Sequence, residues 1–267
     1  MVFVTTDQPH VPTEQAADQP DPGSSPLGIR ARNRAALEEE ILEAGRRHLA
    51  RDGAAALSLR AIARDLGMVS SALYRYVANR DDLLTLLIVA AYTSLGDAVE
   101  KAHGAIPEQD LDARWDSIAH ALRRWALAHP HEYALVYGSP VPDYNAPAER
   151  TTEPGTRVQV LLVRLLADAK RAGRLVDVDG ADENGQDGDR APRDLAERAV
   201  GAMVRTDFFT GSGVDAPTLM TGLAAWSLVM GSVSTEVFGQ LGRDSVSDRD
   251  AYFDVMVGVG RRLVLSS

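Results

Sequence analysis

Apolar residues recur along this chain at the three-to-four-residue spacing of an α-helix. The first such segment, residues 32–53, ends at Gly53 and carries apolar side chains at Leu37, Ile41, Leu42, Ala44 and Leu49. A second helix is predicted from Ser58, a favourable N-cap, to Gly67, with apolar positions at Leu59, Ile62, Ala63 and Leu66. Two helices that end at glycines are therefore expected before residue 68.

A short third helix is predicted over roughly Ser70 to Val77, and a fourth follows Asn79. Asn79 is a suitable N-cap, and Asp82 stands at the third helical position, as in a capping box. The fourth helix is expected to continue to about residue 102, with apolar positions at Leu83, Leu84, Leu87, Ile88 and Tyr92.

The rest of the chain also has helical periodicity, and no β-alternation or internal repeat is evident. Two segments interrupt it: a Pro- and Gly-rich loop at 138–155, and an acidic, Gly-rich stretch at 177–189 that we interpret as a flexible loop. The chain is thus predicted to be all-α, with further helices over 110–129, 131–137, 156–173, 193–211, 216–241 and 248–265.

Length and composition narrow the class of protein. The 267 residues are 45% hydrophobic, which suits one large domain or a small domain joined to a larger one. The longest unbroken apolar run is too short to span a bilayer, so a soluble, cytoplasmic protein is expected. Residues 1–28 have no basic residue and no apolar centre, and are predicted to be a disordered acidic tail rather than a signal peptide. The absence of cysteine excludes disulfides and fits a reducing compartment.

The net charge of −10 argues against a nucleic-acid partner, but the charges are unevenly distributed. Residues 29–80 carry ten Arg against six Asp and Glu, whereas residues 81–267 carry eighteen basic against twenty-eight acidic residues. Such asymmetry indicates a polyanion partner for the basic block. A solvated, arginine-rich surface is the alternative.

The pair of helices at 58–77 has the layout of a helix-turn-helix. Ile62, Ala63, Leu66, Leu73 and Val77 can pack the helices together, and Gly67 supplies the tight turn. If Leu73 and Val77 face inward, Arg75 points outward and Tyr74 and Tyr76 lie on the flanks. Small polar groups, phenols and an arginine suit a DNA groove better than a face that is merely solvated.

The segment LSLRAIARDLGMVSSALYRYVANRDDLL, residues 57–84, resembles the DNA-binding domain of TetR/AcrR-type transcriptional regulators. The match extends over residues 35–84 without a gap, and departs from the family pattern at Val69 and Ala72. The resemblance implies phosphate contacts from Ser58, Arg60, Tyr74 and Arg80. It implies positions at or near base edges for Ser70, Ser71, Ala72, Arg75 and Tyr76. Two alternatives stay open: Ser58 as a helix cap only, and Arg80 as a partner of Asp81 and Asp82.

Two later segments, HEYALVYGSPVPDYNAP and AAWSLVMGSVSTEVFGQL, resemble the WHG-type ligand-binding domain of one TetR subgroup, with Met230 at the histidine position. The resemblance implies a dimer built from the last two long helices, and a small-molecule pocket. The candidate dimer residues form the stripe Trp226, Met230, Val233, Val237 and Leu241, for which plain core is the alternative. Glu236 is expected at the interface or in solvent. Candidate pocket residues, each of which could also be ordinary core, are Trp115, Leu122, Trp125, Tyr133, Tyr137, Leu161 and Leu165.

Other chemistry finds no support in the sequence. The acidic loop fails the EF-hand spacing, His129 and His131 have no third ligand at a recognised spacing, and no nucleophile–base motif is present. We therefore expect no metal, no cofactor and no enzymatic activity.

The predicted organisation is a tail (1–28), a helix-turn-helix domain (29–80) and a larger helical ligand-binding and dimerisation domain (81–267). The expected function is a homodimeric repressor that binds a near-palindromic double-stranded DNA operator and is released by an unknown small-molecule effector. The alternative is a helical ligand-binding or scaffold protein without specific DNA binding.

Overall fold

The computed structural model describes residues 26–176, 190–242 and 245–266. Nearly all of the predicted acidic tail and the whole predicted acidic loop at 177–189 lie outside the described residues. The regular secondary structure of the described chain is helical, apart from one isolated bridge between Leu175 and Leu265, which confirms the predicted all-α class. Its ten α-helices are α1 (Pro26–Asp52), α2 (Leu59–Asp65), α3 (Ser70–Leu73), α4 (Arg80–His103), α5 (Leu111–Ala128), α6 (Pro130–Tyr137), α7 (Ala148–Arg171), α8 (Arg190–Val204), α9 (Ala216–Val237) and α10 (Arg249–Val264).

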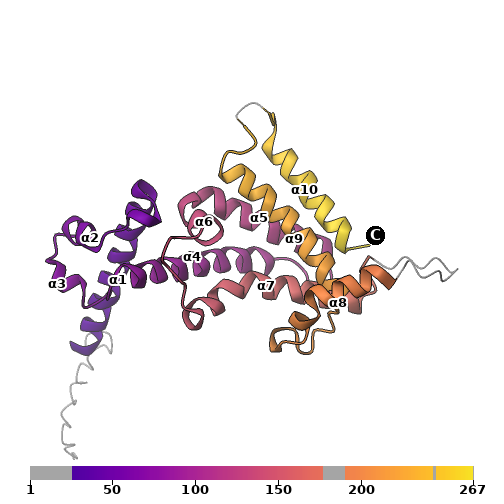
Figure 1. Cartoon of the computed structure of the whole chain (residues 1–267), viewed down its shortest axis with the longest axis horizontal. Helices are drawn as coiled ribbons and strands as arrows, with labels where there is room; N and C mark the ends of the chain where they lie inside the picture. The colour runs from indigo at the N-terminus through magenta and orange to yellow at the C-terminus, as the bar shows by residue number, and fades with distance from the viewer. Residues whose placement is uncertain (1–25, 177–189, 243–244, 267) are drawn as a thin grey trace, which may run out of the picture.

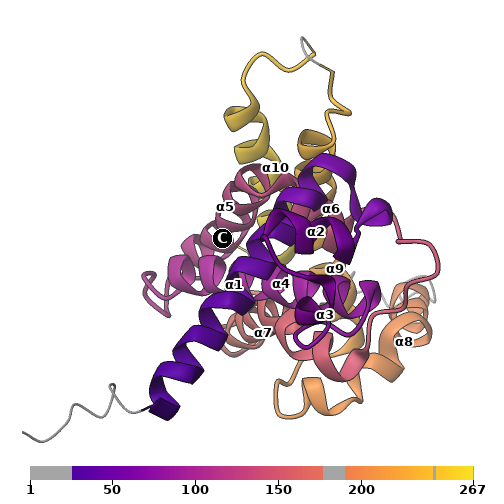
Figure 2. The same cartoon turned by 90° about the vertical axis from the view of Figure 1, so that its left-hand side faces the viewer.

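The helices form two hydrophobic clusters that α4 connects (Figure 1). The smaller cluster joins α1, α2 and α3 to the first turns of α4, and α1 to α3 lie together at one end of the molecule (Figure 2). The larger cluster joins the second half of α4 to α5, α7, α9 and α10. The domain boundary at residue 80 stays a prediction, because α4 supplies Leu83, Leu84 and Leu87 to one cluster and Leu95 and Val99 to the other.

Helices α2, α7 and α9 each end at a glycine with the same backbone geometry. After α9, the Gly239 N–H donates to Glu236 O and the Gln240 N–H donates to Thr235 O, at 3.1 and 2.8 Å. These are the two hydrogen bonds of a Schellman motif, which requires a left-handed residue, and Gly239 has φ of +69°. Helix α9 therefore ends four residues earlier than predicted, and Leu241 lies beyond it.

Helix α7 begins earlier than its composition suggests. The loop predicted over 138–155 ends at residue 147, and Pro154 lies inside the helix. Pro154 is the seventh residue of α7, so the helix lacks the hydrogen bond that an N–H at this position would donate to Arg150 O. The hydroxyl groups of Thr151 and Thr156 donate to backbone carbonyls nearby. Two other helices have different bounds from those predicted. Helix α1 begins at Pro26 rather than at residue 32, and α8 ends at Val204 rather than at residue 211, before a 3₁₀ turn, η3 (Asp207–Phe209).

Candidate DNA-binding surface and ligand cavity

The turn between α2 and α3 is a second Schellman motif. Gly67 has φ of +64°, its N–H donates to Arg64 O, and the N–H of Met68 donates to Ala63 O. Ser58 caps α2 by accepting a hydrogen bond from the Ala61 N–H at 3.4 Å. The buried side chains that hold the two helices together are Leu59, Ile62, Ala63, Leu73 and Val77. Four of them belong to the predicted packing set, and the fifth predicted member, Leu66, is half-buried against the same cluster. This packing fixes which side of α3 faces outward.

Helix α3 is one turn long, and residues 74–76 continue it as a turn rather than as regular helix. Val77 still donates its N–H to Leu73 O, so both side chains remain inward. Tyr74 and Arg75 are exposed, with Tyr74 at 47% of its maximum. Val69, at 70%, is the most exposed large apolar side chain of the described residues and stands at the N-cap of α3. The outward surface is therefore made of small groups, a phenol and an arginine.

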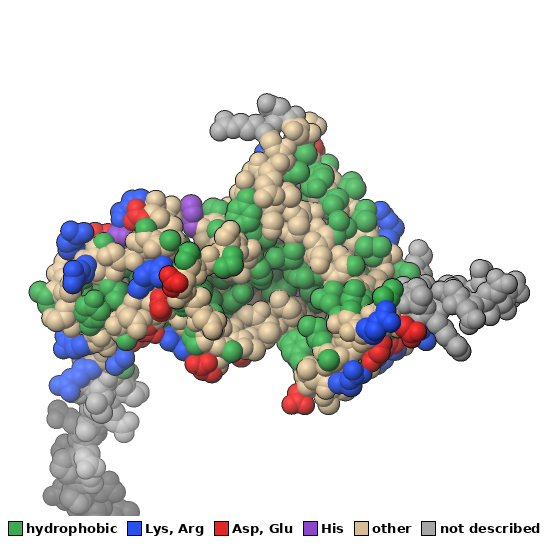
Figure 3. Space-filling view, viewed as in Figure 1, with side chains coloured by type: hydrophobic (Ala, Val, Ile, Leu, Met, Phe, Trp, Pro, Cys, Tyr) green, Lys and Arg blue, Asp and Glu red, His purple; other side chains and the backbone are tan. Residues whose placement is uncertain are grey.

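The arginines of this end divide into two kinds. Arg60, Arg64 and Arg75 are exposed and make no hydrogen bond or ion pair with any described residue. Arg46 contacts Glu39, Glu43 and Glu132, and is thereby tied within the protein. Lys and Arg side chains gather at this end of the molecule (Figure 3). A surface with arginines free to find an anionic partner is the electrostatic requirement for a DNA contact.

Arg80 lies at the first position of α4, and its side chain reaches back over the core of the helix-turn-helix domain. Its Nη2 donates to the carbonyl oxygens of Ala54 and Ala55 at 3.1 and 3.2 Å, and its Nη1 lies 3.4 Å from Asp81. Asp82 does not pair with Arg80; it accepts a hydrogen bond from Arg150 at 2.7 Å. Arg80 thus holds the 3₁₀ turn η2 (Ala54–Ala56) against α4 while remaining partly exposed.

A cavity of about 440 Å³ lies in the larger domain between α5, α7, α9 and η3. The aromatic residues around it are Trp115, Phe208, Phe209 and Trp226, and aliphatic walls come from Leu162, Val163, Leu165, Leu166, Leu219 and Leu223. Trp115 is fixed at its polar edge, because its Nε1–H donates to Val257 O at 3.1 Å. The volume falls in the range of small-molecule sites, most of which are apolar with few polar anchors.

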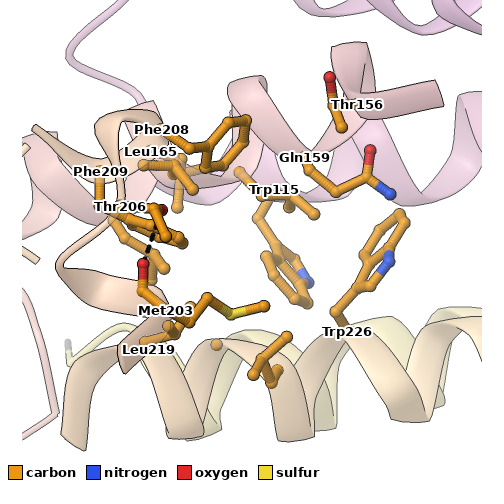
Figure 4. Close-up of a pocket in the computed structure, with 15 residues that line it drawn as sticks. Trp115, Thr156, Gln159, Leu165, Met203, Thr206, Phe208, Phe209, Leu219 and Trp226 are labelled. Atoms are coloured by element: carbon orange, nitrogen blue, oxygen red, sulfur yellow. Dashed lines mark hydrogen bonds between the residues drawn. The ribbon is translucent and has the colours of Figure 1, made fainter. Parts of the chain in front are cut away.

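Besides the two indole N–H groups, the described cavity wall has polar side chains from three residues (Figure 4). The hydroxyl groups of Thr156 and Thr206 donate to Thr152 O and Met203 O, at 2.9 and 2.7 Å. Gln159 is different: its Oε1 is buried and accepts no hydrogen bond from a described residue. In Figure 4 the Gln159 amide lies beside the Trp226 ring, with its nitrogen toward that ring and its oxygen turned away from both indoles.

Comparisons with known proteins agree with this architecture. A family model described as "Bacterial regulatory proteins, tetR family" matches residues 41–87, and one described as "Tetracyclin repressor-like, C-terminal domain" matches residues 115–259. The HTH-type transcriptional regulator Rv1816 of Mycobacterium tuberculosis is 42% identical over 230 residues, which are 85% of this chain and 92% of that relative. The chain belongs to the TetR family of transcriptional regulators.

Solved structures place this TetR-family regulator among proteins of the same fold. SCO4313, described as a regulatory protein, has a TM-score of 0.67 and 30% identity over 86% of this chain and 98% of that chain. A TetR-family transcription regulator of Marinobacter aquaeolei VT8 has a TM-score of 0.57 over 89% of this chain and all of that one. Its 17% identity shows likeness of fold only. The resemblance to the family, including a WHG-type C-terminal domain, is thus confirmed.

The structure divides the nine residues expected at DNA into two groups. Arg60, Ser71, Tyr74 and Arg75 are exposed on the outward side of α2 and α3. Ser58, Ser70, Ala72, Tyr76 and Arg80 are partly buried. Within this second group, the Tyr76 ring lies under the guanidinium group of Arg34 of α1, 5.7 Å from the ring centre. Whether these nine residues touch DNA stays a prediction.

The residues expected to line the pocket are also divided. Trp115 and Leu165 line the cavity, whereas Leu122, Trp125, Tyr133 and Leu161 are buried in the core. The polar ends of two of these core side chains are satisfied: Trp125 donates to Ser94 Oγ at 3.0 Å, and the Tyr133 hydroxyl lies 2.7 Å from Ser234 Oγ. Tyr137 lies at a separate hollow beside α1 and α6, with its ring against that of Tyr133.

Sequence reasoning missed Gln159, Phe208 and Phe209 as cavity residues. A signal for Gln159 was present in the sequence. It shares one helical face with Leu162, Val163 and Leu166, and it is the one polar residue among these four. Both phenylalanines lie within the 3₁₀ turn η3, which is too short for a helical period to mark its inward side.

Most of the stripe expected at a dimer interface is buried or half-buried within the protomer itself. Val233 is fully buried, Trp226 lines the cavity, and Leu241 lies beyond the end of α9. Met230 and Val237 are half-buried against the core of their own chain. Exposed large apolar side chains in or next to α9 and α10 are Met220, Phe238, Val255 and Leu263.

Glu236 occupies neither of its two expected environments. It is buried within the protomer, where its carboxylate binds the guanidinium group of Arg123.

Two helices, α4 and α9, are long and apolar enough to span a membrane by length and composition alone. Both lie within the bundle and supply residues to its core, nine buried ones from α4 and seven from α9.

Proposed function

We propose that this TetR-family regulator is a cytoplasmic, sequence-specific DNA-binding protein whose operator affinity changes when a small molecule occupies the α5–α7–α9 cavity. The observation that supports it most strongly is the exposed surface of α2 and α3, where Arg60, Arg64 and Arg75 have no partner in the described chain. Members of the family bind DNA operators as dimers. Helix α3 is then the element that enters the major groove, with Arg75 as the reader of base edges.

A dimer with two-fold symmetry presents two α3 helices, and the matching operator is a near-palindrome with half-sites about one helical turn apart. We assign the dimer contact to the outer faces of α9 and α10. Their exposed apolar side chains include Met220, Val255 and Leu263. Gly231 supports the assignment, since a Cβ built at this position meets no atom within 4 Å and leaves room for a facing helix.

The cavity and the DNA-binding end are connected through α7. Gln159 and Leu162 of α7 line the cavity, and Arg150, near the start of the same helix, donates to Asp82 of α4 at 2.7 Å. The segment before α7 adds a contact, because the Tyr144 hydroxyl lies 2.9 Å from Thr85 Oγ1 of α4. A ligand that fits one position of α7 better than another therefore favours one placement of the helix-turn-helix domain. The ratio of the ligand's affinities for the two states sets the coupling free energy between ligand binding and DNA binding. We propose that ligand binding releases the protein from DNA, and that the protein acts as a repressor.

The proposal is tested by selection of bound sequences from random DNA, with affinity measured against salt. We expect a palindromic consensus and a steep fall in affinity as salt rises. Arg75→Ala should relax sequence selection, whereas Arg124→Ala, at an exposed position of α5, should not. A purified protein that selects no sequence at any salt concentration would favour the alternative, a helical ligand-binding or scaffold protein.

A further inference from the structure

The cavity has no means of neutralising a charged ligand. Its described wall contains no Asp, Glu, Lys, Arg or His. Moving a carboxylate, ammonium or phosphate group from water into an apolar site without a partner is strongly unfavourable. The wall therefore selects against ionised molecules, whatever their apolar part.

The described wall nevertheless has a buried hydrogen-bond acceptor without a donor. The Thr156 and Thr206 hydroxyl groups already donate to backbone carbonyls, whereas Gln159 Oε1 is buried and accepts nothing within the described chain. A buried acceptor without a donor costs about 1–3 kcal/mol. A primary amide also carries two N–H donors, so the group that satisfies it best both donates and accepts.

We infer that the effector is an uncharged molecule with a large apolar body and a single hydroxyl or carboxamide group, and that this group donates to Oε1 and accepts from Nε2 of Gln159. This inference rests on the proposed function, since it names the ligand of the same cavity. The apolar body contacts Trp115 and Trp226, the two indoles of the cavity wall. Ethers and esters, which accept but do not donate, leave Oε1 unpaired.

The test uses four probes of similar length with the full chain: 1-decanol, decanamide, 1-methoxynonane and decanoate at pH 8. Binding is measured by calorimetry and by fluorescence of the tryptophans, two of which line the cavity. We expect 1-decanol and decanamide to bind about tenfold more tightly than 1-methoxynonane, since one hydrogen bond to a buried acceptor is worth on the order of 1.4 kcal/mol, a factor of ten. Decanoate should bind at least about a hundredfold more weakly than 1-decanol.

Two substitutions on the same face of α7 separate hydrogen bonding from shape. Gln159→Leu, an apolar side chain of similar size, should weaken 1-decanol about tenfold and leave 1-methoxynonane unchanged or tighter. Thr156→Val should change neither, because the Thr156 hydroxyl is already used by the helix backbone. Circular dichroism and operator binding of both variants report whether the fold is retained.

Equal affinity for decanoate and 1-decanol would overturn the inference, as would unchanged 1-decanol binding by Gln159→Leu. If the protein selects an operator but binds none of the probes up to their solubility limits, the ligand class is wrong and the proposed function stands. If 1-decanol binds in a Gln159-dependent manner but no DNA sequence is selected, the ligand class stands and the regulator proposal fails.

Discussion

Arg123 of α5 and Glu236 of α9 form a two-point ion pair in the interior of the ligand domain, with hydrogen bonds of 2.7 and 2.9 Å. Asp250 of α10 adds a third contact at 2.7 Å, from a side chain that is 84% exposed. The hydrogen bonds to Glu236 are the main cause of a raised pKa of Arg123, so the guanidinium group is always charged. Three helices are therefore joined at one buried cation.

Glu236→Gln should destabilise the protein by about 3 kcal/mol, because it leaves the Arg123 charge buried with only an exposed partner. Asp250→Asn should cost no more than about 1 kcal/mol, since pairs with an exposed member contribute little. Chemical denaturation of the two variants against the wild type measures the difference. Equal losses from the two substitutions would show that burial of the pair is not what matters.

Arg75→Ala and Arg80→Ala should have different effects even though both residues lie near α3. Arg75 is exposed and has no partner within the described chain, so its loss should lower operator affinity about tenfold or more at unchanged stability. Arg80 donates to two backbone carbonyls, and its loss should also lower the free energy of unfolding by about 1–2 kcal/mol. Fluorescence anisotropy with operator DNA and urea unfolding separate the two effects. A stable Arg80→Ala variant would mean that the contacts to Ala54 and Ala55 are dispensable.

Arg150→Gln should weaken the response to ligand more than it weakens DNA binding itself. The substitution removes the charge that links α7 to Asp82 of α4, while the cavity on α7 is left intact. Operator affinity measured with and without 1-decanol should show a ligand effect several-fold smaller than in the wild type. Arg171→Gln, at the other end of α7, is the matched control. A wild-type response from Arg150→Gln would place the coupling elsewhere.

Acid should remove the stabilisation that Asp215 provides at the start of α9. Burial opposes ionisation of this carboxyl, but hydrogen bonds from Lys170 and from Thr218 outweigh it and lower its pKa to about 2 from 3.8. Because the folded pKa is the lower one, the stabilisation is present above about pH 4 and is lost as pH falls toward 2. The side chain is 54% exposed, so solvent screening reduces the effect to about 1 kcal/mol. Asp215→Asn should reduce the change in the free energy of unfolding between pH 4 and pH 2 by that amount.

Much of the fold followed from local chemistry. Helical spacing predicted the all-α class, and Gly67 and Gly173 marked helix ends because left-handed residues are required there. The same rule applied at Gly239 would have ended α9 correctly, but the apolar stripe continued to Leu241 and suggested a longer helix. Pro154 led to a wrong start for α7, because a proline usually marks a helix boundary, whereas this one lies at the seventh position of the helix.

Side-chain roles were harder to predict than helices. An apolar stripe shows that residues face something, but it does not distinguish core, cavity and partner: Val233 is core and Trp226 is cavity although both belong to one stripe. Glu236 shows the reverse case, because its partner Arg123 is 113 positions away and no local pattern joins them. Contacts of this kind depend on how helices cross, which one sequence does not specify.

The basic end of the molecule also affects how the protein meets DNA. Residues 29–80 carry four more basic than acidic residues, and residues 81–267 carry ten more acidic than basic ones. Since α1 to α3 lie together at one end, the excess of arginines in this block gathers at that end of the described protomer (Figures 1 and 3). The field of a polyanion turns such a molecule during diffusion, so that the arginines arrive first and the acidic bundle trails. Most collisions then begin in a productive orientation, and this advantage fades as salt shortens the range of the field.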